Sequence, residues 1–120
     1  MLRLMDILRV YKENGNVQGV VLKRIAKRAG MYEAVGFLHT QMVVPHILSS
    51  MRTHPNVRKV QVMGLHALSA ILLHTDKASA LVHVKPHVMS IVSLADAAQT
   101  TISGDPELAR HTKALLSRLL

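Results

Sequence analysis

The chain has 120 residues, of which 49% are hydrophobic and 18% charged, and its formal net charge is +8. This length and composition predict one compact domain with a buried core, and they exclude an intrinsically disordered chain and a two-domain enzyme. The absence of Cys excludes disulfides, thiolate zinc sites, iron–sulfur clusters and cysteine nucleophiles.

Helices are the predicted secondary structure, because apolar residues recur at three- and four-residue spacing and aromatic residues are rare. The predicted helices cover residues 2–13, 17–29, 42–53, 57–74, 85–98 and 106–119, with short helical segments near 31–38 and 76–82. Pro45 and Pro86 fit a first helical turn, where a missing N–H is tolerated, and Asp105 fits an N-cap. The apolar run Leu81–Val84 also fits a strand, and a sheet there would contradict the all-helical prediction.

The buried face of each helix follows from the same spacing. In the helix 17–29, Ile25 is the centre of the predicted apolar stripe, and Lys23 and Lys27 lie on the opposite side. Leu68 is predicted to be a central core residue. Met51 and Met89 are also predicted to pack in the core, with an adaptable Met-rich binding surface as the weaker alternative.

The sequence repeats itself with a period of about 40–43 residues, which is the range of HEAT and armadillo repeats. The strongest similarity is the motif Pro-His-(Ile/Val)-(Leu/Met)-Ser, which occurs twice at a spacing of 41. Three alignments carry the period: Pro45–Ser49 with Pro86–Ser90 at 41, Tyr11–Val17 with Met51–Val57 at 40, and Val17-Gln18 with Val60-Gln61 at 43.

The segment Val60–Ile71 resembles the long helix of the armadillo repeat, whose pattern is V-Q-x-x-A-L-W-A-L-S-N-I, at its Val-Gln, Leu, Ala-Leu-Ser and Ile positions. The resemblance implies an all-α, armadillo-like right-handed superhelix (solenoid) of about three short repeats. It implies one domain over residues 1–120, with approximate units 1–15 (partial), 16–55, 56–103 and 104–120 (partial). His66 replaces the family's groove Trp and Ala70 its peptide-binding Asn, which argues against clamping of an extended peptide backbone.

By the same resemblance, six residues occupy groove-facing positions: Lys23, Lys27, His66, Ala70, Lys113 and Ser117. Such a groove would be basic, and the alternative is a solvated helix face without a partner. With an ordinary pKa of about 6.5, His66 is expected to gain charge just below neutral pH. Arg24 and Arg28 align with Ala67 and Ile71 of the central long helix, which suggests that they cap an end of the solenoid.

Catalytic signatures are absent from the sequence, since it contains no glycine-rich phosphate loop, G-x-S-x-G or H-E-x-x-H motif. We therefore expect a protein that is not an enzyme and needs no cofactor. The His residues raise the question of a metal, but His83 and His87 lack a third ligand in the sequence, so no metal site is predicted.

The expected function is a non-enzymatic scaffold that binds another protein, with an acidic segment as the favoured ligand. The alternative is a structural or nucleic-acid-associated subunit of a larger assembly, because the positive charge suits phosphate. Residues 1–60 contain ten Lys and Arg against three acids, so the N-terminal half carries most of the charge. No segment is long and apolar enough for a membrane span. An intracellular, cytoplasmic location is expected, with organelle import as the alternative.

Overall fold

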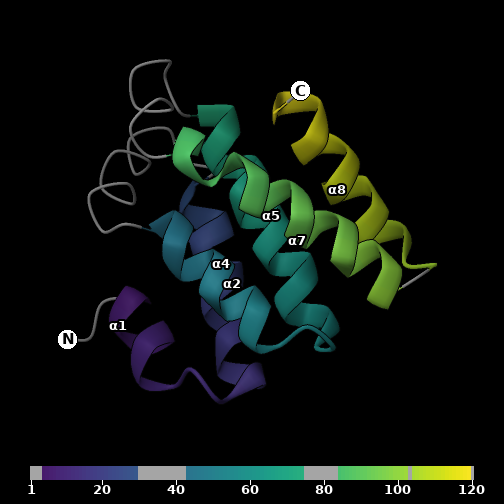
Figure 1. Cartoon of the computed structure of the whole chain (residues 1–120). Helices are drawn as coiled ribbons and strands as arrows, with labels where there is room; N and C mark the ends of the chain where they lie inside the picture. Colours follow the sequence, from purple (N-terminus) through teal and green to yellow (C-terminus); the bar gives the residue numbers. More distant parts are fainter. Residues whose placement is uncertain (1–3, 30–42, 75–83, 103, 120) are drawn as a thin grey trace.

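The computed structural model describes residues 4–29, 43–74, 84–102 and 104–119, and within these ranges all regular structure is helical (Figure 1). The elements are α1 (Leu4–Val10), α2 (Gly15–Ala29), α4 (Val43–Thr53), α5 (Arg58–His74), the short 3₁₀ helix η2 (Lys85–His87), α7 (Val88–Thr101) and α8 (Pro106–Leu119). The described ranges contain no strand, which agrees with the all-helical prediction. The predicted segments 31–38 and 76–82, and residues 81–83 of the apolar run, lie outside the described residues.

The helices form two layers (Figure 1). In one layer α5 packs against α2 on one side and against α8 on the other, and in the second layer α4 packs against α1 and α7 in the same way. Each helix of the second layer also packs on the helix that follows it in the chain, α1 on α2, α4 on α5 and α7 on α8. The chain therefore alternates between a 1–4–7 layer (α1, α4, α7) and a 2–5–8 layer (α2, α5, α8).

Side-chain caps set the starts of α2 and α8. The Asn14 Oδ1 accepts a hydrogen bond of 3.1 Å from the Val17 backbone N–H, so α2 begins two residues earlier than predicted, and α1 ends earlier. The Asp105 Oδ1 accepts from the N–H groups of Glu107 and Leu108, which confirms the predicted N-cap of α8. Pro86 lies in η2, and the α-helix after it runs to Thr101, three residues beyond the predicted end.

The core is centred on α5, which is covered by neighbours on three sides. Leu68 is 1% exposed, as predicted, and belongs to a hydrophobic cluster that joins the described α-helices. Met51 is fully buried, but the prediction for Met89 is wrong, because its side chain is 80% exposed. The buried face of α7 is centred on Ile91. At about 100° per residue, Met89 lies about 160° from Ile91 around the helix and therefore on the opposite face.

A buried glutamine amide recurs at the junction of the two layers. Gln18 and Gln61 each donate two hydrogen bonds of 2.9–3.1 Å from Nε2 to carbonyl oxygens at the end of the preceding helix. The acceptors are Leu8 and Tyr11 for the first amide, and Met51 and His54 for the second. Donors and acceptors are all 43 residues apart, so Tyr11 corresponds to His54, and the alignment of this turn at a spacing of 40 is wrong by three residues.

Gly64 and Gly19 lie where two helices approach closely, and they differ in how well they would tolerate a side chain. A Cβ on Gly64 would lie 2.7 Å from Sδ of Met51, which is fully buried. We expect Gly64→Ala to lower the free energy of unfolding by about 1–2 kcal/mol, because overpacking outweighs the gain in helix propensity. Chemical denaturation followed by circular dichroism measures this loss.

Gly19 provides the matched control. A Cβ there would lie 2.8 Å from Cγ and 3.2 Å from Cβ of Lys59, and rotation of this exposed side chain can relieve the contact with Cγ. We expect Gly19→Ala to lower the free energy of unfolding by less than Gly64→Ala does, because only the looser contact with Lys59 Cβ then remains. Equal losses in the two variants would contradict the tight packing of α4 on α5.

Candidate functional site

The six residues predicted to face a groove lie on the three helices of the 2–5–8 layer. Lys23 and Lys27 are on α2, His66 and Ala70 on α5, and Lys113 and Ser117 on α8. The two α5 residues are half-buried and the other four are exposed. Since α5 lies between α2 and α8, the six residues are distributed across three adjacent helices, although none of them bonds to another within the part of the chain described here.

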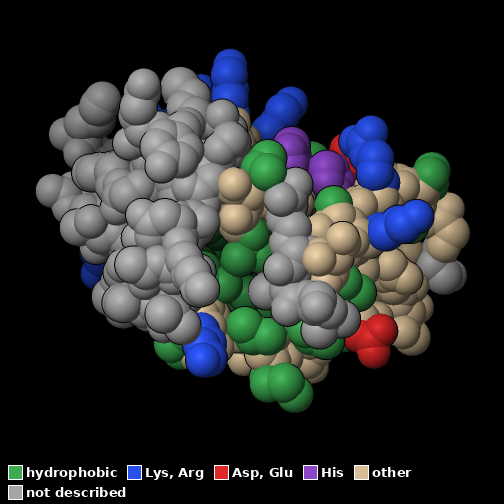
Figure 2. Space-filling model, turned by 90° about the horizontal axis from the view of Figure 1, so that it is seen from above, with side chains coloured by type: hydrophobic (Ala, Val, Ile, Leu, Met, Phe, Trp, Pro, Cys, Tyr) green, Lys and Arg blue, Asp and Glu red, His purple; other side chains and the backbone are tan. Residues whose placement is uncertain are grey.

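Charge is segregated between the two layers. The helices of the 2–5–8 layer contain one acid, Glu107, and nine cations: Lys23, Arg24, Lys27, Arg28, Arg58, Lys59, Arg110, Lys113 and Arg118. The helices of the 1–4–7 layer, together with η2, contain three cations and two acids. Figure 2 shows the His side chains and most of the visible Lys and Arg side chains along one edge of the molecule, with other Lys and Arg side chains on the opposite side. The excess charge thus follows the layers, whereas the sequence showed only a difference between its halves.

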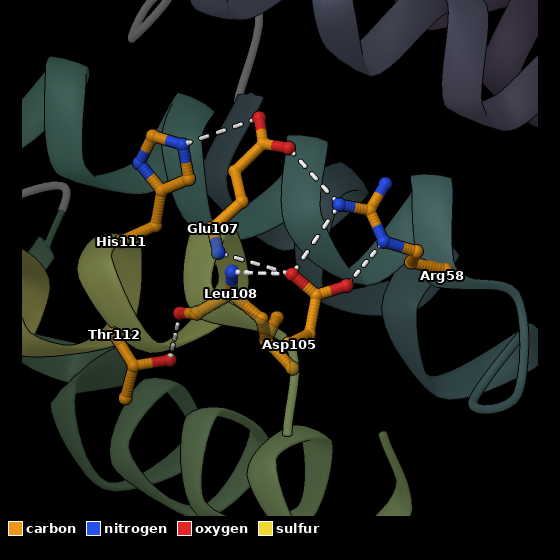
Figure 3. Close-up of polar contacts among 6 residues, drawn as sticks. All are labelled: Arg58, Asp105, Glu107, Leu108, His111 and Thr112. Atoms are coloured by element: carbon orange, nitrogen blue, oxygen red, sulfur yellow. Dashed lines mark hydrogen bonds and ion pairs between the residues drawn. The ribbon is translucent and has the colours of Figure 1, made fainter. Parts of the chain in front are cut away.

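The acidic groups at the start of α8 are already paired. Arg58 donates from Nε to Oδ2 of Asp105, and from Nη2 to Oε2 of Glu107 at 3.0 Å (Figure 3). The hydrogen bond from Arg58 is the main reason why the pKa of Asp105 is lowered, and the backbone N–H of Leu108 adds to it. Glu107 therefore offsets Arg58, while Lys23, Lys27 and Lys113 form no salt bridge among the described residues.

His66 does not stand alone on this surface. Its ring stacks on that of His111 from α8, with centroids 4.4 Å apart and planes at 15°. His111 is 9% exposed, and its Nε2 atom is buried without a hydrogen-bond partner, 4.0 Å from Oε1 of Glu107 (Figure 3). Sequence reasoning missed His111, and the one available signal was its position four residues after Glu107 on a helix, where a Glu and a His can meet.

The environment disfavours protonation of both rings. Burial lowers the pKa of His66, the positive charge of Arg110 lowers it further, and Glu107 opposes both effects. The pKa of His111 is lowered by burial, then by His66 and by Arg110. His66 is therefore neutral at pH 7, and the expectation that it charges just below neutrality has to be corrected to a lower pH.

The stacked arrangement is unsuited to shared metal ligation. Imidazole nitrogens bind a metal through lone pairs in the ring plane, and in nearly parallel stacked rings these lone pairs do not converge. Among the described residues no three His, Asp or Glu side chains form a group that could hold a metal ion. The pair His83 and His87 cannot be compared, because His83 lies outside the described residues.

These histidines predict a loss of stability in mild acid. The unfolded chain protonates near the ordinary His pKa of 6.5, whereas His66 and His111 bind protons only at lower pH in the folded protein. The free energy of unfolding should therefore fall as pH drops from about 6.5, and level off below the folded pKa values. Melting temperatures between about pH 7.5 and 5 measure this, and His111→Leu should flatten the decline. An equally steep decline in that variant would contradict the assignment.

Comparison of the chain with protein-family models, curated proteins and solved structures gives no match to any of them. The armadillo resemblance therefore depends on the pattern in Val60–Ile71 and on the 43-residue recurrence of buried contacts. No helix in the described part of the chain is long and apolar enough to cross a bilayer.

Proposed function

We propose that this protein is an armadillo-like solenoid of about three short repeats that acts as a non-enzymatic scaffold and binds an acidic segment of another protein on its 2–5–8 layer. The observation that carries this proposal is the concentration of nine cations against one acid in that layer. Three of these cations, Lys23, Lys27 and Lys113, are exposed and form no salt bridge among the described residues.

The packing order supports the solenoid part of the proposal. Each pair of described α-helices repeats the previous pair, and alternate α-helices of the described chain are neighbours in a layer. The glutamine amides repeat with the helices, since Gln18 and Gln61 tie each long helix to the end of the helix before it. In repeat proteins this nearest-neighbour packing leaves one extended face free for a partner.

Charge is the feature by which this face would recognise a ligand. His66 and Ala70 occupy the places of the family's groove Trp and peptide-binding Asn, so they cannot clamp a peptide backbone as those residues do. Exposed Lys side chains attract Asp and Glu at long range and raise the association rate, and this effect falls as salt rises. An acidic segment of a protein is therefore the favoured ligand.

A charge-reversal experiment tests this surface. We expect Lys23→Glu with Lys27→Glu to weaken binding of a fluorescent Glu-rich peptide at least about tenfold at low salt, because attraction becomes repulsion on the α2 side of the site. Fluorescence anisotropy across a salt series measures the affinity, and circular dichroism checks that helix content is retained.

The matched control is Arg52→Glu with Lys85→Glu, which reverses two exposed charges in the other part of the molecule. Equal losses from the two double variants would show that only net charge matters, and would contradict a site on the 2–5–8 layer. The same series with single-stranded and duplex RNA tests the nucleic-acid alternative. Tighter binding of RNA, with a steep salt dependence, would replace the acidic protein segment by a phosphate backbone.

A further inference from the structure

The repeated Pro-His-x-x-Ser motif has no role in the surface described above, because it lies in the 1–4–7 layer. Its first copy begins α4 and places His46 and Ser49 one turn apart. Both residues line a cleft of about 200 Å³ between α4 and α1, where Arg9 and Lys12 form the opposite wall. Residues from α1, the turn after it and α4 thus bring two cations, an imidazole and a hydroxyl to one small cleft.

The floor of this cleft is a closed hydrogen-bond network. The Ser50 hydroxyl donates to Oε1 of Gln18 at 2.6 Å, and the Gln18 amide donates to two carbonyl oxygens at the end of α1. Gln18 is 1% and Ser50 4% exposed, so these groups are buried and partnered. The floor fixes α1 against α4 without using the donors on the walls.

The wall donors are largely uncommitted. Among the residues that the structure describes, Lys12 Nζ, the His46 ring and the Ser49 hydroxyl have no hydrogen-bond partner, and Arg9 pairs only with Asp6 at 3.5 Å on the surface. Arg9 acts on His46, since burial lowers the pKa of that ring first and the charge of Arg9 second, with Asp6 opposing. The cleft therefore has a positive potential, and Asp6 is the acid that reduces it.

We propose that the cleft between α1 and α4 binds one phosphate monoester group through Arg9, Lys12, His46 and Ser49. A phosphate monoester carries close to two negative charges at neutral pH, and its oxygens accept charged N–H and hydroxyl hydrogen bonds. Pockets for drug-sized ligands usually exceed about 300 Å³, so this cleft fits the phosphate group and leaves the rest of its carrier outside. The carrier is either a small free phosphomonoester or a phosphorylated side chain of a partner.

The second copy of the motif gives an internal comparison. His87 and Ser90 repeat His46 and Ser49 after 41 residues, and Arg52 follows Arg9 by 43 residues. Pro55 stands 43 residues after Lys12, however, so the second copy lacks one of the two long cations. We therefore assign the phosphate group to the first copy. Arg52 and Lys85 are exposed cations outside this cleft and serve as the control.

The test is a titration of the full chain with phenyl phosphate and with a phosphoserine peptide, followed by amide shifts in two-dimensional NMR. We expect saturable shifts centred on His46 and Ser49, and binding about tenfold weaker in Arg9→Gln with Lys12→Gln. The control Arg52→Gln with Lys85→Gln removes the same charge elsewhere and should bind as the unmodified chain does.

The two titrants distinguish the carriers. Tighter binding of the peptide supports a phosphorylated partner, and equal binding supports a free phosphomonoester. Shifts that do not saturate with either titrant, or equal weakening in the control variant, would overturn the proposal. Lys23 and Lys27 do not line this cleft, so Lys23→Glu with Lys27→Glu should leave phosphate binding unchanged whatever it does to the acidic peptide.

Discussion

Replacing Leu68 with Ala is expected to lower the free energy of unfolding by about 2–5 kcal/mol. The side chain is 1% exposed and lies on α5, the helix that packs on α2, α4 and α8. Truncation removes apolar contacts and leaves a cavity where several helices meet. Small domains are stable by only about 5–15 kcal/mol, so this one change should make the fold marginal. Urea denaturation followed by circular dichroism measures the loss.

The control for this experiment lies on the same helix. Leu73 is 52% exposed, so Leu73→Ala makes the same chemical change with little loss of buried area. We expect an effect of no more than about 0.5 kcal/mol. A similar loss in both variants would show that α5 buries a different face from the one described here.

Local periodicity was sufficient to predict most of the fold. The stripe centred on Ile25 correctly separated the buried Val21 and Leu22 from the exposed Lys23 and Lys27, because a straight helix has a fixed angle per residue. The buried Leu68 followed from the same rule. The start of α2 was predicted two residues too late, because Asn14 was not identified as its cap.

The comparison of aligned helices also predicted a difference in exposure between α2 and α5. Ala67 and Ile71 of α5 are buried, whereas Arg24 and Arg28 at the aligned positions of α2 are exposed. Among the described helices, α5 packs between α2 and α8, while α2 packs against α5 and α1. The exposed Arg side chains keep this face of α2 hydrated, as the end of the proposed solenoid would require.

Contacts between distant residues could not be predicted from the sequence. Arg58 pairs with Asp105, which lies 47 residues later in the sequence, and the two stacked residues His66 and His111 have a similar separation in sequence. Neither contact has a local pattern, because each depends on how α5 and α8 pack. Met89 is a residue whose burial was predicted and is not observed. Its apolar side chain suggested a core position, but no described helix covers that face of α7.

The buried glutamine predicts the second large effect. We expect Gln61→Leu to lower the free energy of unfolding by about 2–3 kcal/mol, because the carbonyls of Met51 and His54 lose their donors. The size of the side chain is nearly unchanged, so the loss reports the hydrogen bonds rather than a cavity. Chemical denaturation measures it, with Gln99→Leu as the control at an exposed position of α7. If both variants were equally stable, the amide would not be what holds the end of α4 to α5, and the 43-residue recurrence would lose its physical basis.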